Sequence, residues 1–285
     1  MIESFLASWD LFHQTYLAGW LIALLLSLVG VFVVARDQIF IGIAISQAST
    51  LGIAIGMGVG SWLHLHDVAW LSSDGFLSGM AVVFAILAAL LTARRGEAGG
   101  ESHEAITGWV FLLSASLSIL LVAHSPHGLD EIQRLLSSSL IGATTRDVWT
   151  FAGLAGCTIL ALGIAHRRLL LFAMDAPMAA AVGMRVSWWA AGAAIWLGLV
   201  IGLSMRVSGM LYTFGILVLP ALVAKNMCRE VRIIFLISPV IALSVSAIGF
   251  VLANHYDYPP AQMTVALLSG LLVIAWLYQS RIATR

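Results

Sequence analysis

The sequence predicts an all-α polytopic membrane protein with about eight to nine transmembrane helices. Of its 285 residues, 61% are hydrophobic and only 10% are charged, and the mean hydropathy is +1.00. Soluble domains are about 45–50% apolar and about 25% charged, so this chain has too little polar surface to face water. The alternating pattern of a membrane β-strand is absent from the sequence. Fourteen basic residues balance fourteen acidic ones, so no basic surface points to nucleic acid as a partner.

Nine apolar runs are candidates to cross a bilayer, which takes about 20 residues in a helix. The second run is rich in Gly and the fifth is short, so eight helices with one broken or re-entrant segment is the alternative. No long linker or internal repeat separates the runs, so we expect residues 1–285 to form a single transmembrane domain. The runs are residues 15–35, 39–62, 75–93, 105–123, 149–165, 187–205, 208–224, 231–253 and 262–280.

The basic residues predict the orientation, because Lys and Arg near helix ends stay on the cytoplasmic side of a membrane. With nine crossings and a cytoplasmic C-terminus, eleven of the fourteen basic residues fall inside and only Arg134, Arg146 and Arg206 fall outside. The N-terminus is then outside.

Glycines recur at four-residue spacing in two of the runs, in GIAIGMGVG around Gly52 and Gly56 and in GLVIG at Gly198 and Gly202. Small residues let helix backbones approach closely in lipid. Ordinary static packing is the favoured interpretation, and a moving helix contact is the alternative.

The sequence lacks the groups that would let the chain work alone. Its acidic residues all fall in predicted loops or at helix ends, whereas proton-driven transporters usually carry ionisable residues inside the membrane. The single lysine, Lys225, lies in LVLPALVAKN, which lacks a phosphate-binding Gly-rich loop, and no HExxH or G-x-S-x-G motif is present. We therefore expect no catalytic residue and no permanently bound cofactor. A purely structural scaffold and a secondary transporter are the less favoured classes.

A short helix is predicted at about residues 174–184, in RRLLLFAMDAPMAAAVGMRV, which the charge pattern places in the cytoplasm. Asp175 can cap its start, the alanines including Ala179 favour helix, and Gly183 can close it in a left-handed conformation. About two turns are too few to span a membrane and are marginal in water, so the helix must rest on something. It is either a linker on the membrane surface or a lever that docks into a cytosolic partner.

Histidines gather on the predicted outer side. Two clusters also carry acids, His64-Leu65-His66-Asp67 and His124-Ser125-Pro126-His127 followed by Asp130 and Glu131. Imidazole with carboxylate suits a divalent transition metal. Ordinary polar residues at a water interface are the competing interpretation. The candidate metal ligands at this outer mouth are His64, His66, Asp67, His124 and His127.

Five stretches, taken together and in order, resemble the membrane permeases of metal-uptake ABC transporters, the zinc, manganese and iron family called ABC-3. LLLFAMDAPMAAAVGM resembles the family's cytoplasmic coupling helix, and VSGMLYTFGILVLPALVAK resembles a following helix with a Leu-Leu-x-x-Pro-Ala core that includes Pro220. The other three are LVGVFVVARDQIFIGIAISQASTLGIAIG, SSSLIGATTRDVW and ANHYDYPPAQMTVAL. The matches cover about residues 20 to 278.

The resemblance implies a mechanism and partners. Such permeases pair with a second permease chain, here most simply as a homodimer, bind cytosolic ABC ATPase subunits that hold ATP, and receive a divalent metal cargo from an extracytoplasmic binding protein. Asp175, Ala179 and Gly183 would lie on the coupling helix that contacts the ATPase. The chain would be a multi-pass permease of the bacterial plasma membrane, with zinc or manganese the expected cargo and iron the next.

The sequence departs from the family pattern at the start of the second helix. The family usually has Gly-Asp-Ala-x-Ser-His-Ala there, and this chain has Ile43 and Gln47 in place of the acid and the imidazole. Gln47 can still offer a carbonyl oxygen to a hydrated ion, or it packs between helices. Ser46, Gln47 and Pro220 are the pathway candidates. The departure keeps open a second cargo class, a metal chelate.

Overall fold

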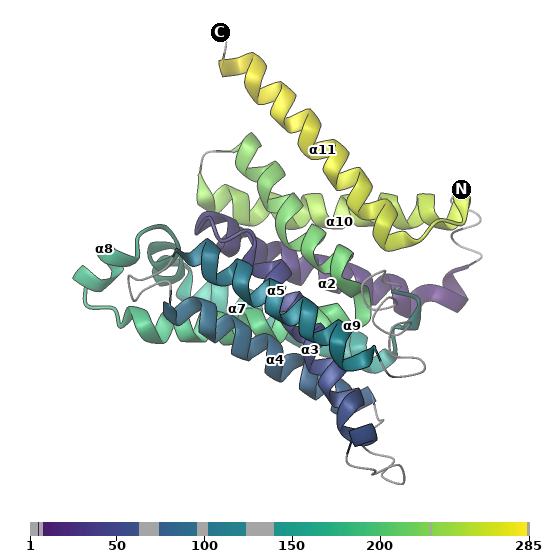
Figure 1. Cartoon of the computed structure of the whole chain (residues 1–285). Coiled ribbons are helices and arrows are strands. Elements are labelled where there is room, and N and C mark those ends of the chain that lie inside the picture. The colour runs from purple at the N-terminus through teal and green to yellow at the C-terminus, as the bar shows by residue number, and fades with distance from the viewer. Residues whose placement is uncertain are drawn as a thin grey trace. The chain divides into compact units, whose positions relative to one another are not determined.

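The computed structural model describes residues 5, 8–62, 74–95, 102–123, 140–228 and 230–283, and all regular structure within them is helical. The predicted all-α fold class is confirmed (Figure 1). The elements are α2 (Trp9–Ala35), α3 (Ile41–Trp62), α4 (Asp74–Arg95), α5 (His103–Val122), the 3₁₀ turn η1 (Leu140–Gly142), α7 (Thr145–Met174), α8 (Ala176–Ala181), α9 (Val186–Met227), α10 (Val231–Tyr256) and α11 (Pro260–Ala283).

Eight helices in the described ranges are long and apolar enough to cross a membrane. The short fifth run is in fact the 30-residue α7, which starts at a capping box: the Asp147 backbone N–H donates to Thr144 Oγ1, and the Asp147 carboxylate accepts from the Thr144 backbone N–H at 2.9 Å. The runs 187–205 and 208–224 both lie in α9, whose 42 residues comprise two helical stretches joined across a kink at Gly209. The kink lies close to the boundary between these two predicted runs.

Gly209 interrupts α9 because its backbone is not helical. Its φ of 72° and ψ of 175° lie where an L side chain is strained and glycine is not. Two helical stretches, each about long enough to span a bilayer, therefore meet without a polar loop between them. Contacts divide the chain into two compact units, and the division falls in α9 between Met210 and Leu211.

Unit 1 comprises residues 1–37, 138–179 and 211–285. Its helices approach closely: a Cβ at Gly30 would overlap the backbone carbonyl of Leu217, and one at Gly249 would lie 2.5 Å from Thr264 Oγ1. The Tyr212 hydroxyl is fully buried and donates to the Gly19 carbonyl oxygen at 3.0 Å. Small residues and a few buried hydrogen bonds thus hold α2, the second half of α9, α10 and α11 together.

Unit 2 comprises residues 38–137 and 180–210. A Cβ at Gly52 of α3 would overlap the Met80 backbone of α4, and one at Gly198 of α9 would lie 2.6 Å from the Ile86 Cα. These glycines therefore serve close helix packing, as the four-residue spacing predicts. Of the membrane-spanning residues, 78% are buried in α3 but only 28% in α4 and 33% in α5. α3 is therefore much more buried than α4 and α5.

Candidate functional site

Two candidate pathway residues lie on α3, in the interior of unit 2. Ser46 is fully buried, and its hydroxyl donates to the Gly42 carbonyl oxygen one turn earlier at 2.9 Å. Thr50 Oγ1 likewise donates to the Ser46 carbonyl oxygen at 3.2 Å. Both hydroxyls are satisfied within their own helix, so Ser46 needs no external partner.

Gln47 is different because its side chain reaches another helix. It is 7% exposed, and its Nε2 donates to the Met210 thioether sulfur at 3.1 Å. A thioether is a weak acceptor, and the Gln47 carbonyl oxygen has no hydrogen bond to any residue in the described ranges. The bond to Met210 therefore fixes the position of the Gln47 side chain, and the Gln47 carbonyl oxygen remains available to accept a hydrogen bond.

Methionines surround this part of unit 2. Met205 is fully buried in a cluster with Ile53 and Ala81, and Met57 and Met210 pack against the same cluster. The residues that the structure describes hold no group of three or more His, Cys, Asp or Glu side chains that could bind a metal. The hydrogen-bond partner of the Gln47 amide is thus a soft thioether sulfur.

Two buried serines were missed by the sequence analysis. Ser49 on α3 and Ser204 on α9 are fully buried, and neither hydroxyl has a hydrogen-bond partner among the described residues. Buried polar groups are nearly always paired with protein or ordered water, so these two hydroxyls indicate places for water or a polar cargo. Nothing in the sequence spacing distinguishes Ser49 and Ser204 from serines whose hydroxyls bond to their own helix. Nor does the sequence indicate that Met210 contacts Gln47.

Pro220 lies in the second half of α9, in unit 1, and is buried. Its position as a pathway residue remains a prediction. The outer-mouth candidates His64, His66, Asp67, His124 and His127 all lie outside the described residues.

The short helix α8 follows α7 after a single residue (Figure 1). Asp175 caps it: the carboxylate accepts from the Met178 backbone N–H at 2.8 Å, and its carbonyl oxygen accepts from the Ala179 N–H at 3.0 Å. Gly183 has a φ of +86° and donates its N–H to the Ala180 carbonyl oxygen. The two ends of α8 are therefore both fixed by local bonds.

α8 buries one side and exposes the other. Ala179 is fully buried, whereas Met178 is 53% exposed, and Val182, just beyond the helix, is 68% exposed. Met174, at the end of α7, is 65% exposed as well. Several exposed apolar side chains on so short a segment form a surface of the kind that other proteins cover.

The end of α7 is anchored to α2 within unit 1. The Arg36 guanidinium carbon lies 4.5 Å from the centre of the Phe172 ring and 5.6 Å from that of Phe32, a cation–π arrangement. Next to it, Lys225 Nζ lies 3.3 Å from the Asp37 carboxylate. The chain therefore enters α8 from a helix end that is held in place.

The sequence profile of the ABC 3 transport family matches residues 8–279. The manganese import system permease protein ScaB of Streptococcus gordonii is 24% identical over 278 residues, which cover 96% of this chain and 94% of that protein. The chelated iron transport system membrane protein YfeD of Yersinia pestis is 22% identical over 248 residues, 87% of this chain and 78% of that protein.

Among solved structures, a chain of PsaBC from Streptococcus pneumoniae, in complex with Fab, matches with a TM-score of 0.78 and 21% identity. The match covers 97% of this chain and 95% of that one, and at this identity it concerns the fold. Because the family match spans nearly the whole sequence, the chain belongs to the ABC 3 transport family, as its motifs predict.

Proposed function

We propose that this chain is the permease subunit of an ABC importer that carries a divalent transition metal ion into the cytoplasm, manganese or zinc foremost and iron next. The family match over residues 8–279 carries this proposal, together with eight apolar helices. Relatives named for manganese import and for chelated iron transport support a metal as cargo. The protein would be a multi-pass component of the bacterial plasma membrane with its C-terminus in the cytoplasm.

Energy for transport comes from a partner in this proposal. A cytosolic ABC ATPase binds ATP and contacts α8, where Asp175, Ala179 and Gly183 set the shape of the helix. Closure of two ATPase subunits pushes α8 and switches the permease between inward- and outward-facing states as rigid bodies. The exposed apolar side chains at Met178 and Val182 support a protein contact there.

Two further partners complete the transporter. An extracytoplasmic binding protein delivers the metal, and a second permease chain, most simply another copy, forms the other half of the pathway. The outer histidines and Asp67 would be the first groups of this chain that meet the metal. Ser46, Gln47 and Pro220 would lie further along the path.

A metal chelate is the second candidate cargo, and the surroundings of Gln47 favour it. A bare divalent ion needs several oxygen, nitrogen or thiolate ligands to replace its water. The Gln47 amide contacts a thioether, and the described residues hold no group of three or more His, Cys, Asp or Glu side chains that could replace this water. A chelate brings its own ligands and needs only a neutral passage.

The test is the manganese, zinc and iron content of cells that lack this chain, grown with a chelator and with each metal restored. We expect a selective fall in one metal that the intact chain restores. Restoration by free metal but not by its chelate supports the ion as cargo, and the converse supports the chelate. Unchanged contents of all three metals under every condition would contradict the proposal.

A secondary transporter is the competing class, and a proton ionophore separates the two. With cellular ATP held constant, an ABC importer continues to take up metal when the proton gradient is dissipated. Uptake that collapses under these conditions would contradict coupling through α8.

A further inference from the structure

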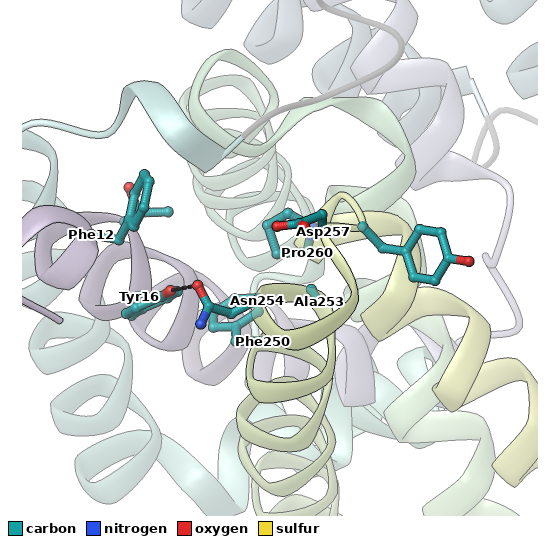
Figure 2. A pocket seen from close by; sticks show the side chains of 9 residues that line it. Phe12, Tyr16, Phe250, Ala253, Asn254, Asp257 and Pro260 are labelled. Carbon is teal, nitrogen blue, oxygen red and sulfur yellow. Dashed lines mark hydrogen bonds between the residues drawn. The ribbon is translucent and has the colours of Figure 1, made fainter. Parts of the chain in front are cut away.

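A cavity of about 230 Å³ lies in unit 1 among α2, α10 and the start of α11. None of its lining residues belongs to α8 or to the pathway candidates. Figure 2 shows Phe12 and Tyr16 on one side of the space, with Asn254 and Phe250 below it and Asp257 and Pro260 opposite. Ligand pockets for drug-sized molecules are about 300–1,000 Å³, so this cavity suits a small group rather than a whole cofactor.

Aromatic rings form much of the cavity wall. The ring centres of Phe12 and Tyr16 are 6.3 Å apart, and those of Tyr16 and Phe250 are 5.8 Å apart. The Tyr16 hydroxyl donates to Asn254 Oδ1 at 3.3 Å, which ties the wall on α2 to that on α10. Tyr16 and Phe250 are only 5% and 0% exposed, so the rings that a bound group can contact are those of the partly exposed Phe12 and the exposed Tyr258. The faces of aromatic rings are electronegative and attract ammonium groups within about 6 Å.

Asp257 supplies the only formal charge among the lining residues that the structure describes. It ends α10 in the left-handed conformation, with a φ of 54°, and its carboxylate makes no hydrogen bond or ion pair with any residue that the structure describes. The C-terminal end of α10 and the N-terminal end of α11 meet here. Because these two helix ends carry partial charges of opposite sign, their effects on the cavity oppose each other. The electrostatic character of the cavity is therefore that of one unpaired carboxylate beside aromatic faces, which selects a cation.

We infer that this cavity binds the ammonium headgroup of an ethanolamine lipid. A primary ammonium matches both the carboxylate and the rings, and it gives up water more readily than a divalent ion, for which the cavity offers a single carboxylate. The cavity lies at the ends of three membrane helices, the depth at which lipid headgroups and tyrosines occur together. Tyr256 and Tyr258, beside Asp257, are 54% and 58% exposed, as expected of side chains at that depth.

The test is native mass spectrometry of the purified full-length chain in detergent, with equal amounts of phosphatidylethanolamine and phosphatidylglycerol added. The wild type should retain the ethanolamine lipid in preference. Asp257→Asn removes the charge and keeps a residue that tolerates the left-handed backbone. We expect it to lower that preference about two- to fivefold, the range of an exposed ion pair.

Two variants make the result specific. Asp10→Asn removes a carboxylate from the first turn of α2 that does not line the cavity, and it should leave the lipid preference unchanged. Asn254→Asp keeps the acceptor for Tyr16 and adds a carboxylate, so it should raise the preference for the ethanolamine lipid.

Three results would overturn the inference. The wild type could hold both lipids equally, or Asp257→Asn and Asp10→Asn could behave alike. Finally, micromolar manganese could displace the lipid from the wild type but not from Asp257→Asn, which would identify a metal site instead. All three can be read without any transport activity.

Discussion

The surroundings of Gln47 and the short helix α8 differ in what holds them and in what they leave open. Gln47 is buried in unit 2 with one weak bond, to the Met210 sulfur, and its carbonyl oxygen has no hydrogen bond to any residue that the structure describes. α8 is fixed at both ends by Asp175 and Gly183, yet it exposes apolar side chains. In the proposed function, the first region serves passage without tight binding, and the second serves a firm contact with the ATPase. A partner can thus be inferred from α8 more directly than a cargo from Gln47.

The largest effect should follow from Ala179→Asp. Ala179 is fully buried, and a carboxylate there would be desolvated without a partner, at a cost of several kcal/mol. The buried side of α8 would therefore lose its packing. Metal uptake should fall at least about tenfold, because a free-energy change of about 1.4 kcal/mol already corresponds to a factor of ten. Uptake of radioactive manganese by cells checks this, with the amount of protein in the membrane fraction measured in parallel.

The matched control is Ala181→Ser, at an exposed position of the same helix. It should keep uptake near the wild-type rate. If Ala181→Ser and Ala179→Asp lose metal uptake equally, any change in α8 is harmful. The claim that coupling depends on the buried side of the helix would then be wrong.

A smaller effect is expected from Gly183→Ala. A Cβ at Gly183 meets no atom within 4 Å, so the change acts only through its left-handed backbone, at about 1–2 kcal/mol. We expect uptake to fall about five- to thirtyfold, the factor that this energy allows if all of it opposes the docked shape of α8.

Gly192 on α9 provides the comparison. A Cβ there also meets nothing within 4 Å, but its backbone is helical, so Gly192→Ala should be neutral or slightly stabilising. If the Gly183 and Gly192 variants transport equally well, the closing turn of α8 is irrelevant to coupling.

Next in size should be Gln47→Leu. It keeps the volume of the side chain and removes both the amide donor and the free carbonyl oxygen. Loss of about one hydrogen bond to a polar cargo predicts a two- to fivefold slower uptake. Thr92→Val is the control, because the buried Thr92 hydroxyl bonds only to carbonyl oxygens of its own helix, α4, among the described residues. Equal rates for Gln47→Leu and the wild type would remove Gln47 from the pathway.

Met210→Leu should have the smallest effect. It removes a weak acceptor and preserves the packing against the cluster of Ile53, Ala81 and Met205. Uptake should remain within about twofold of the wild type, since a thioether bond is weaker than the typical hydrogen bond of about 1 kcal/mol. A change in metal preference, measured by competition between manganese and zinc, would instead make Met210 a ligand.

The sequence predicted most of the fold, because apolar runs of bilayer length carry the signal for membrane helices. It left the number of spans open by one and did not locate a broken segment. The Gly-rich second run folds as the regular α3, since its glycines serve close packing, for example Gly52 against Met80. The kink in α9 is at Gly209, two residues beyond the predicted boundary between the runs 187–205 and 208–224, and the backbone angles fix its position.

The candidate site was predictable only in part. The end signals of α8 are local, so Asp175 and Gly183 could be named from the sequence with their conformations. The contact of Gln47 with Met210 joins residues far apart in the chain, and the unpaired hydroxyls of Ser49 and Ser204 depend on burial. Neither kind of information is present in spacing or composition.

The most direct test of ATP-driven metal transport through α8 is manganese uptake in cells whose proton gradient is dissipated while ATP is held constant. The wild-type chain and Ala179→Asp should be compared at equal amounts in the membrane. We predict that the wild type continues to take up metal and that the variant does not. Uptake that stops in the wild type, or that continues equally in Ala179→Asp, would contradict the account.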